Sequence, residues 1–273
     1  MSVKRSALAA VTLFCLACIA SVAVHAQSRV DLELVLAVDV SQSMDLEEQR
    51  LQRNGYVAAF RHRDIIKAIA SGLHGRIAVS YLEWAGDHFQ SIVIPWRTIA
   101  SAADANAFAD ELASRAISRE KRTSISNALL IAASMIRQND IDGVRKVIDV
   151  SGDGPNNSGP PVALARDRVM RDNITVNGLA FVEERSEGLS SFFSVPNLDH
   201  YYERCVIGGE GSFAMPVHEK QEFTTAIRRK LLREIAYRPT HAPRAIHKAQ
   251  YKPPASNFDC LVGEKKWKAF QNE

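Results

Sequence analysis

The chain has 273 residues, of which 46% are hydrophobic and 24% charged, and this composition excludes a wholly disordered chain and allows a large buried core. Its formal net charge of +3 falls to +1 when Lys4 and Arg5 of the N-terminal segment are removed. Such a balance predicts no nucleic-acid partner.

The first 26 residues have the layout of a secretory signal peptide. Lys4 and Arg5 precede an uncharged apolar run, and residues 24–26 provide a cleavage site before Gln27. We therefore expect a periplasmic or secreted protein. Because the apolar run is nearly long enough to cross a bilayer, an uncleaved anchor is the alternative, and only that alternative places the protein at a membrane.

Strands and helices are expected to alternate after this segment. A continuous apolar-rich stretch over residues 32–38 predicts a buried strand. A long helical pattern follows over residues 46–71 and stops at Gly72. Next come two strands that favour a hairpin (76–84 and 90–96), two helices (104–115 and 124–137), a turn at 140–143 and an apolar strand (146–150).

The same order then repeats. A Gly/Pro/Asn-rich loop (152–161) precedes a helix ending near Asp172, a strand (175–181), an irregular stretch with Tyr201 and Tyr202, a short strand (212–215) and an amphipathic helix (219–237). This alternation predicts an α/β fold, a doubly wound, mostly parallel sheet with helices on both faces. In such sheets, sites form at the carboxyl ends of the strands.

We expect one domain over residues 27–238, followed by a flexible tail over residues 239–273, where prolines are interleaved with Lys and His.

Two cysteines remain once the signal peptide is removed. They are Cys205 and Cys260, and in an oxidising compartment they can pair. The alternative is one buried thiol and one tail thiol that never meet. The sequence gives no distance between them, so both alternatives stay open.

Oxygen-bearing side chains follow the first predicted strand. Asp39, Ser41 and Ser43 alternate along a tight loop that can turn them towards one point. Oxygen donors suit a hard cation. Mg²⁺ fits best because it binds through few carboxylates and leaves positions for an incoming ligand, and Mn²⁺ or Ca²⁺ can substitute.

This motif resembles the metal-ion-dependent adhesion site of von Willebrand factor A domains. That family has a threonine in a second loop, which Thr123 matches, and an aspartate after the fourth strand, often before glycine, which Asp153-Gly154 matches. The resemblance covers roughly residues 31–237 and is strongest to an uncharacterised bacterial branch of exported proteins. It implies that Ser41, Ser43 and Thr123 coordinate the ion, with Asp39 and Asp153 acting partly through water.

Two residues depart from the family pattern. Arg122 and Ser126 stand where the second loop usually has glycine, so the backbone of that loop can differ. Each motif also has a simpler interpretation: Asp39-x-Ser41 as a helix cap, Thr123 as a cap of the next helix, and Asp-Gly as a turn. A degenerate site that keeps the fold without the ion is therefore the alternative.

The resemblance implies a binding module that captures an acidic group of a protein partner through the open position of the cation. Arg119, Lys121 and Arg122 would steer an acidic ligand, although a solvated charge cluster is the plainer interpretation. A metal-dependent envelope hydrolase is the alternative from another class, but no catalytic base or nucleophile is recognisable. A metal-free assembly factor is the third hypothesis. The sequence does not determine the oligomeric state.

Overall fold

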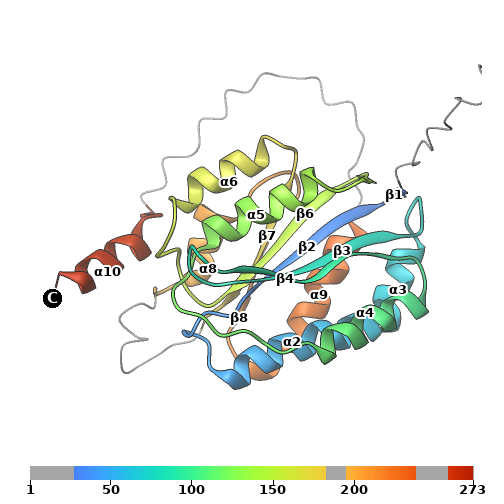
Figure 1. Ribbon diagram of the computed structural model, residues 1–273, viewed down its shortest axis with the longest axis horizontal. Coiled ribbons are helices and arrows are strands. Elements are labelled where there is room, and N and C mark those ends of the chain that lie inside the picture. The colour runs from blue at the N-terminus through green and yellow to red at the C-terminus, as the bar shows by residue number, and fades with distance from the viewer. Residues whose placement is uncertain (1–27, 183–194, 238–257, 273) are drawn as a thin grey trace, which may run out of the picture.

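The computed structural model describes residues 28–182, 195–237 and 258–272 (Figure 1). The expected signal peptide lies outside these residues. Among the helices in the described ranges, none combines the length and the apolar character that crossing a bilayer requires.

A six-stranded sheet forms the centre of the molecule, in the order β4-β3-β2-β6-β7-β8. Its strands are β2 (Leu32–Asp39), β3 (Ile77–Trp84), β4 (Gln90–Ile99), β6 (Lys146–Gly152), β7 (Thr175–Phe181) and β8 (Ala214–Val217). All neighbours are parallel except β3 and β4, which form the expected antiparallel hairpin at one edge. The predicted doubly wound α/β fold is confirmed.

Helices cover both faces of this sheet (Figure 1). On one side lie α2 (Leu46–Arg61), α3 (Arg63–Ala70), α4 (Ala102–Ser114) and α9 (Phe223–Ala236), which the short 3₁₀ turn η2 (Lys220–Glu222) precedes. On the other side lie α5 (Ile125–Arg137), α6 (Val162–Met170), α8 (Leu198–Tyr201) and the π-helical turn η1 (Tyr202–Val206).

The central strand β2 shows why two covering layers are needed. Leu34 and Leu36 belong to the hydrophobic core on the α2 side, and Val35 and Ala37 belong to the core on the α5 side. All four side chains are fully buried. A strand buried on both faces has a continuous apolar sequence, which is why this segment was predictable.

The long helix expected over residues 46–71 is divided at His62, and that prediction is wrong. His62 has an extended backbone (φ −79°, ψ 130°), and its ring accepts a hydrogen bond from the backbone N–H of Asp64, so it caps α3. The change of direction lets Ile65 and Ile69 bury themselves in the core while α3 contacts α9. Tertiary packing therefore overrides the continuous helical pattern.

Two features were missed because they depend on contacts between distant segments. β1 (Ser28–Val30) pairs in parallel with β5 (Ile141–Gly143), where only a turn was expected. In the tail expected to be flexible, the described residues 258–272 contain the helix α10 (Val262–Gln271).

Of the two alternatives for the cysteines, the disulfide is confirmed, because Cys205 and Cys260 are joined with their Cα atoms 5.5 Å apart.

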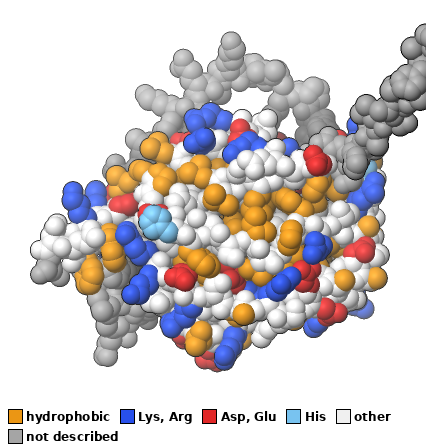
Figure 2. Space-filling model, viewed as in Figure 1, with side chains coloured by type: hydrophobic (Ala, Val, Ile, Leu, Met, Phe, Trp, Pro, Cys, Tyr) orange, Lys and Arg blue, Asp and Glu red, His pale blue; other side chains and the backbone are white. Residues whose placement is uncertain are grey.

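The molecular surface carries charges of both signs. On the face shown in Figure 2, Lys and Arg side chains are interspersed with Asp and Glu side chains. Hydrophobic side chains form a band across the middle of this face. The absence of a nucleic-acid partner stays a prediction.

A buried ionic cluster joins α9 to the sheet. The Lys230 ammonium group forms ion pairs with Asp149 of β6 and, at 2.7 Å, with Glu234. The Asn177 amide donates a hydrogen bond of 3.0 Å to Glu234. Burial, followed by the charge of Asp149, raises the pKa of Glu234 to about 7, because two carboxylates share one cation.

This cluster predicts a loss of stability as the pH rises. The pKa of Glu234 lies above its ordinary value of 4.5, so the folded state retains a proton that the unfolded chain has released. The stabilisation is full below pH 4.5 and is lost as the pH rises through about 7. One proton gives a slope of at most about 1.4 kcal/mol per pH unit. Glu234→Gln should flatten this slope in urea titrations between pH 5 and 8, whereas Glu210→Gln, on the exposed surface, should retain it.

Candidate metal centre

Asp39 is the last residue of β2, at the carboxyl edge of the sheet. The loop that follows is fixed at both ends. At its start, the backbone N–H of Val40 donates to the carbonyl of Trp84 at 2.9 Å. At its end, Asp45 and Glu48 form a capping box, in which each side chain accepts from the other residue's backbone N–H, at 2.8 and 2.7 Å.

Oxygen atoms of the first and third predicted loops converge here. The backbone N–H of Ser41 donates to Asp39 Oδ1 at 2.7 Å. The hydroxyls of Ser41 and Ser43 are 2.7 Å apart, and Ser43 Oγ donates to Asp153 Oδ1 at 2.7 Å. Asp153 reaches this point because it directly follows β6, which pairs with β2. Four of the five predicted residues are therefore connected by hydrogen bonds.

Thr123 is positioned through its backbone. Its N–H donates to the side-chain oxygen of Asn157 at 2.9 Å, and its carbonyl accepts from the Asn157 N–H at 2.8 Å. These two bonds join the second loop to the loop that follows Asp153. The helix α5 is capped by Ser124, whose hydroxyl accepts from the Asn127 N–H, so the interpretation of Thr123 as the cap is wrong.

The first and second loops are also joined. The backbone N–H of Gln42 donates to the Glu120 carbonyl at 2.8 Å, and the Glu120 N–H donates to the Val40 carbonyl at 3.1 Å. All three loops are thus hydrogen-bonded to one another. A site held in this way is largely formed before any ligand arrives.

The second loop keeps a glycine-like backbone although it lacks the glycine. Arg122 has a φ of +68°, in the left-handed region that a side chain disfavours by about 1–2 kcal/mol. The other departure, Ser126, is buried, and its N–H donates to Asn156 Oδ1 at 3.0 Å. Arg122 thus adopts a backbone conformation typical of glycine, and Ser126 is fixed by a hydrogen bond to the third loop.

One oxygen of the Asp39 carboxylate lacks a hydrogen-bond partner among the described residues. Its Oδ2 atom is buried and accepts no hydrogen bond from any described residue. Burial and the nearby charge of Asp153 hold the pKa of Asp39 well above its usual range. An unpaired buried carboxylate oxygen is costly, and a bound cation would remove that cost. Two carboxylates and the neighbouring hydroxyls are the donor set that suits Mg²⁺.

Tyr202, in a segment expected to be irregular, also lies beside Asp39. A Cβ atom placed on Gly152 would lie 2.7 Å from Asp39 Oδ2 and 2.9 Å from Tyr202 Oη, so both oxygens converge above this glycine. The phenol is buried, and burial holds its pKa well above 10. Tyr202 therefore brings a protonated hydroxyl to the same space as Asp39.

One cavity lies at the carboxyl edge of the sheet, beside Asp153, and a second one lies away from it. A cavity of about 30 Å³ is lined by Met44, Glu48 and Asp153, and is large enough for a water molecule or a small ion. A much larger one, about 1320 Å³, lies at the other end of the sheet and includes none of the predicted ligands. Trp84, the last residue of β3, is fully buried in the core.

Comparisons with solved structures place the fold. Proximal thread matrix protein 1 from the mussel byssus, solved with a zinc-occupied MIDAS motif, matches with a TM-score of 0.53 and 12% identity over 77% of this chain and 49% of its own. The pilus adhesin SpaC from Lactobacillus rhamnosus GG matches with a TM-score of 0.51 and 10% identity over 76% and 30%. The chain thus spans about half the length of the first protein.

A von Willebrand factor type A protein from Catenulispora acidiphila has a TM-score of 0.49 and 12% identity over 76% of this chain and 43% of its own. At such identities the matches show the fold alone, which is the doubly wound α/β fold described above. No curated protein sequence matches the chain. The model of a family described as proteins of unknown function, DUF1194, matches residues 29–239, so the chain belongs to the DUF1194 family.

Proposed function

We propose that this protein is an exported binding module that captures an acidic group of a protein partner through a divalent cation. Asp39, Ser41, Ser43, Thr123 and Asp153 would hold the ion, with Mg²⁺ as the expected cation and Mn²⁺ or Ca²⁺ as substitutes. The observation that carries the proposal is the buried, unpartnered Oδ2 of Asp39 beside two serine hydroxyls and a second carboxylate.

The bound cation would supply an open coordination position for a carboxylate. The chain's own residues would hold the ion in a preformed setting, because the three loops are already joined to one another. Arg119 and Lys121 are exposed on the second loop and would attract an acidic partner. The adhesin and the zinc-occupied MIDAS motif among the structures of similar fold favour the same class of function.

Asp39→Asn should separate the stability of the fold from cation binding. The amide can still accept from the Ser41 N–H, and it removes a buried charge beside Asp153, so the protein should be at least as stable as the wild type in EDTA. In Mg²⁺ at a hundredfold excess over Kd, the wild type should gain about 2.7 kcal/mol and the variant nothing. Thermal unfolding with Mg²⁺ and with EDTA measures both quantities.

The matched control is Asp140→Asn, an exposed aspartate at the opposite edge of the sheet, which should retain the wild-type response to Mg²⁺. An equal Mg²⁺ stabilisation of Asp39→Asn would contradict the assigned ligands.

Partner capture should depend on the cation. Immobilised protein exposed to an envelope extract in Mg²⁺ should retain a partner that EDTA releases and that Asp39→Asn does not bind. Retention that EDTA leaves unchanged would overturn the proposal. Metal-dependent hydrolysis of generic phosphate or acyl esters, lost in Asp153→Ala, would favour the hydrolase instead.

Export is supported by the Cys205–Cys260 disulfide, because disulfides persist in oxidising compartments. When the full chain is expressed in a bacterium with a periplasm, the protein should leave the cytoplasm and its mature N-terminus should be Gln27. N-terminal sequencing and fractionation measure these outcomes. An intact Met1 in the cytoplasmic fraction would contradict export, whereas an intact Met1 in the membrane fraction would indicate the uncleaved anchor.

A further inference from the structure

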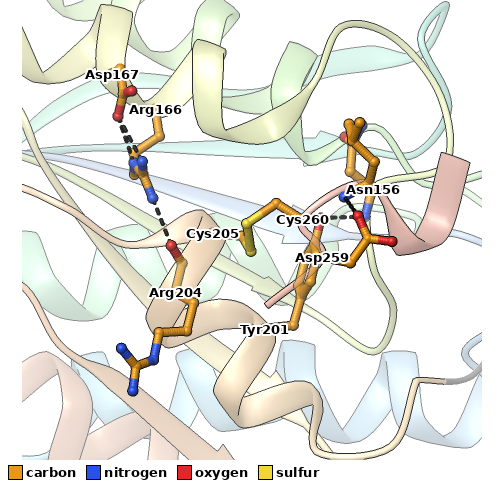
Figure 3. Close-up of a disulfide and its surroundings, with 9 residues drawn as sticks. Asn156, Arg166, Asp167, Tyr201, Arg204, Cys205, Asp259 and Cys260 are labelled. Atoms are coloured by element: carbon orange, nitrogen blue, oxygen red, sulfur yellow. Dashed lines mark hydrogen bonds and ion pairs between the residues drawn. A yellow bond between two sulfur atoms is a disulfide. The ribbon is translucent and has the colours of Figure 1, made fainter. Parts of the chain in front are cut away.

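The C-terminal helix α10 lies against the loops of the candidate metal centre, far in sequence from any of them. Figure 3 shows the disulfide that holds it, with Cys260 just before α10 joined to Cys205 of η1. The same turn η1 begins with Tyr202, which converges with Asp39 above Gly152. One covalent bond thus fastens α10 to the element that reaches the site.

Asn156 connects these parts by hydrogen bonds. It is fully buried, three residues after Asp153. Its backbone N–H donates to the hydroxyl of Tyr201 at 3.1 Å, and its side-chain amide donates to Glu264 of α10 at 2.8 Å (Figure 3 shows Asn156 beside Tyr201). Its Oδ1 accepts from the Ser126 N–H at the start of α5. A single side chain therefore links α10 to the second and third loops.

The helix also touches the loop backbone directly. A Cβ atom on Gly263 would lie 2.1 Å from the Asn156 carbonyl oxygen, so only glycine allows α10 to approach this closely. Further along the helix, Trp267 stacks on the guanidinium of Arg122, whose carbon lies 4.1 Å from the ring centroid. That guanidinium also donates to the carbonyl of Asn157. These contacts hold the side chain of Arg122, the residue directly before Thr123.

We propose that Asn156 is a positioning residue of the cation site, and that α10, fastened by the Cys205–Cys260 disulfide, keeps it in place, so that cation affinity depends on the disulfide. The inference rests on the proposed function, because it requires the ion. Without the disulfide, α10 is no longer fastened to η1 and can detach. Asn156 then loses the hydrogen bond to Glu264, and the loops that carry Thr123 and Asp153 lose their packing against α10. By linkage, the bound cation then protects the disulfide from reduction to the same extent.

The first experiment measures Mn²⁺ affinity by electron paramagnetic resonance on the full mature chain. The oxidised wild type is compared with the Cys205→Ser/Cys260→Ser double variant. Both are measured at a temperature well below the one at which each protein unfolds when no metal is bound. Affinity at least tenfold weaker in the double variant is expected. Wild-type affinity in a folded double variant overturns this inference and leaves the proposed function intact. No Mn²⁺ binding by the oxidised wild type overturns the proposed function itself.

The role of Asn156 is tested by reversing its hydrogen bond to α10. Asn156→Asp places a carboxylate opposite Glu264 and should weaken Mn²⁺ binding. Adding Glu264→Gln gives an amide that donates to the new carboxylate, and this pair should restore part of the affinity, because the carboxylate still faces the Pro160 carbonyl to which the Asn156 amide donates at 3.1 Å. A merely structural role would change the melting temperature in EDTA without this loss and rescue, and equal Mn²⁺ affinity in all three proteins would overturn the assignment. Lys268→Ala, on the exposed side of α10, is the matched control.

The converse experiment measures the fraction of reduced disulfide at equilibrium in a dithiothreitol redox buffer, with and without Mg²⁺. Saturating Mg²⁺ should lower the reduced fraction in the wild type and should have no effect in Asp39→Asn, where the ion cannot bind. Equal reduced fractions in the wild type with and without saturating Mg²⁺ would overturn the coupling.

Discussion

The carboxylate of Asp39 is the group around which this edge of the molecule is organised. It ends the central strand of a parallel sheet, so the chain segments that follow β3 and β6 necessarily arrive beside it. The N–H of Ser41 satisfies one oxygen, and the other remains buried without a partner among the described residues. Since an unpaired buried oxygen is costly, this arrangement supports the proposed cation site.

The second buried polar cluster provides a useful contrast. Lys230, Asp149 and Glu234 are also buried and charged, but their charges oppose one another and Asn177 adds a hydrogen bond. Such a group anchors α9 to the sheet with a cation of its own. The difference lies in composition: Asp149 and Glu234 share a buried lysine, whereas Asp39 accepts from the Ser41 N–H and Asp153 accepts from the Ser43 hydroxyl.

The C-terminal segment extends the domain beyond the sheet and its covering helices. α10 packs against the loops around the proposed cation site through Glu264, Gly263 and Trp267, and the disulfide joins it covalently to the folded unit. Arg122, whose backbone is left-handed, is one of the loop residues that α10 contacts. Its backbone strain is compatible with the fold because its side chain is held by Asn157 and by Trp267.

The sheet strands were predictable from the sequence, because a run such as Leu34 to Ala37 is apolar on both faces and suits a strand that is buried on both sides. The sequence also determined which residues follow the strand ends, and hence that Asp39, Ser41, Ser43 and Asp153 meet at one edge. Four features were not predictable in this way: the break at His62, the pairing of β1 with β5, the position of Tyr202 beside Asp39, and the packing of α10 against Asn156. Each of these depends on contacts between segments far apart in the chain, and local patterns of hydrophobicity and capping carry no record of such contacts.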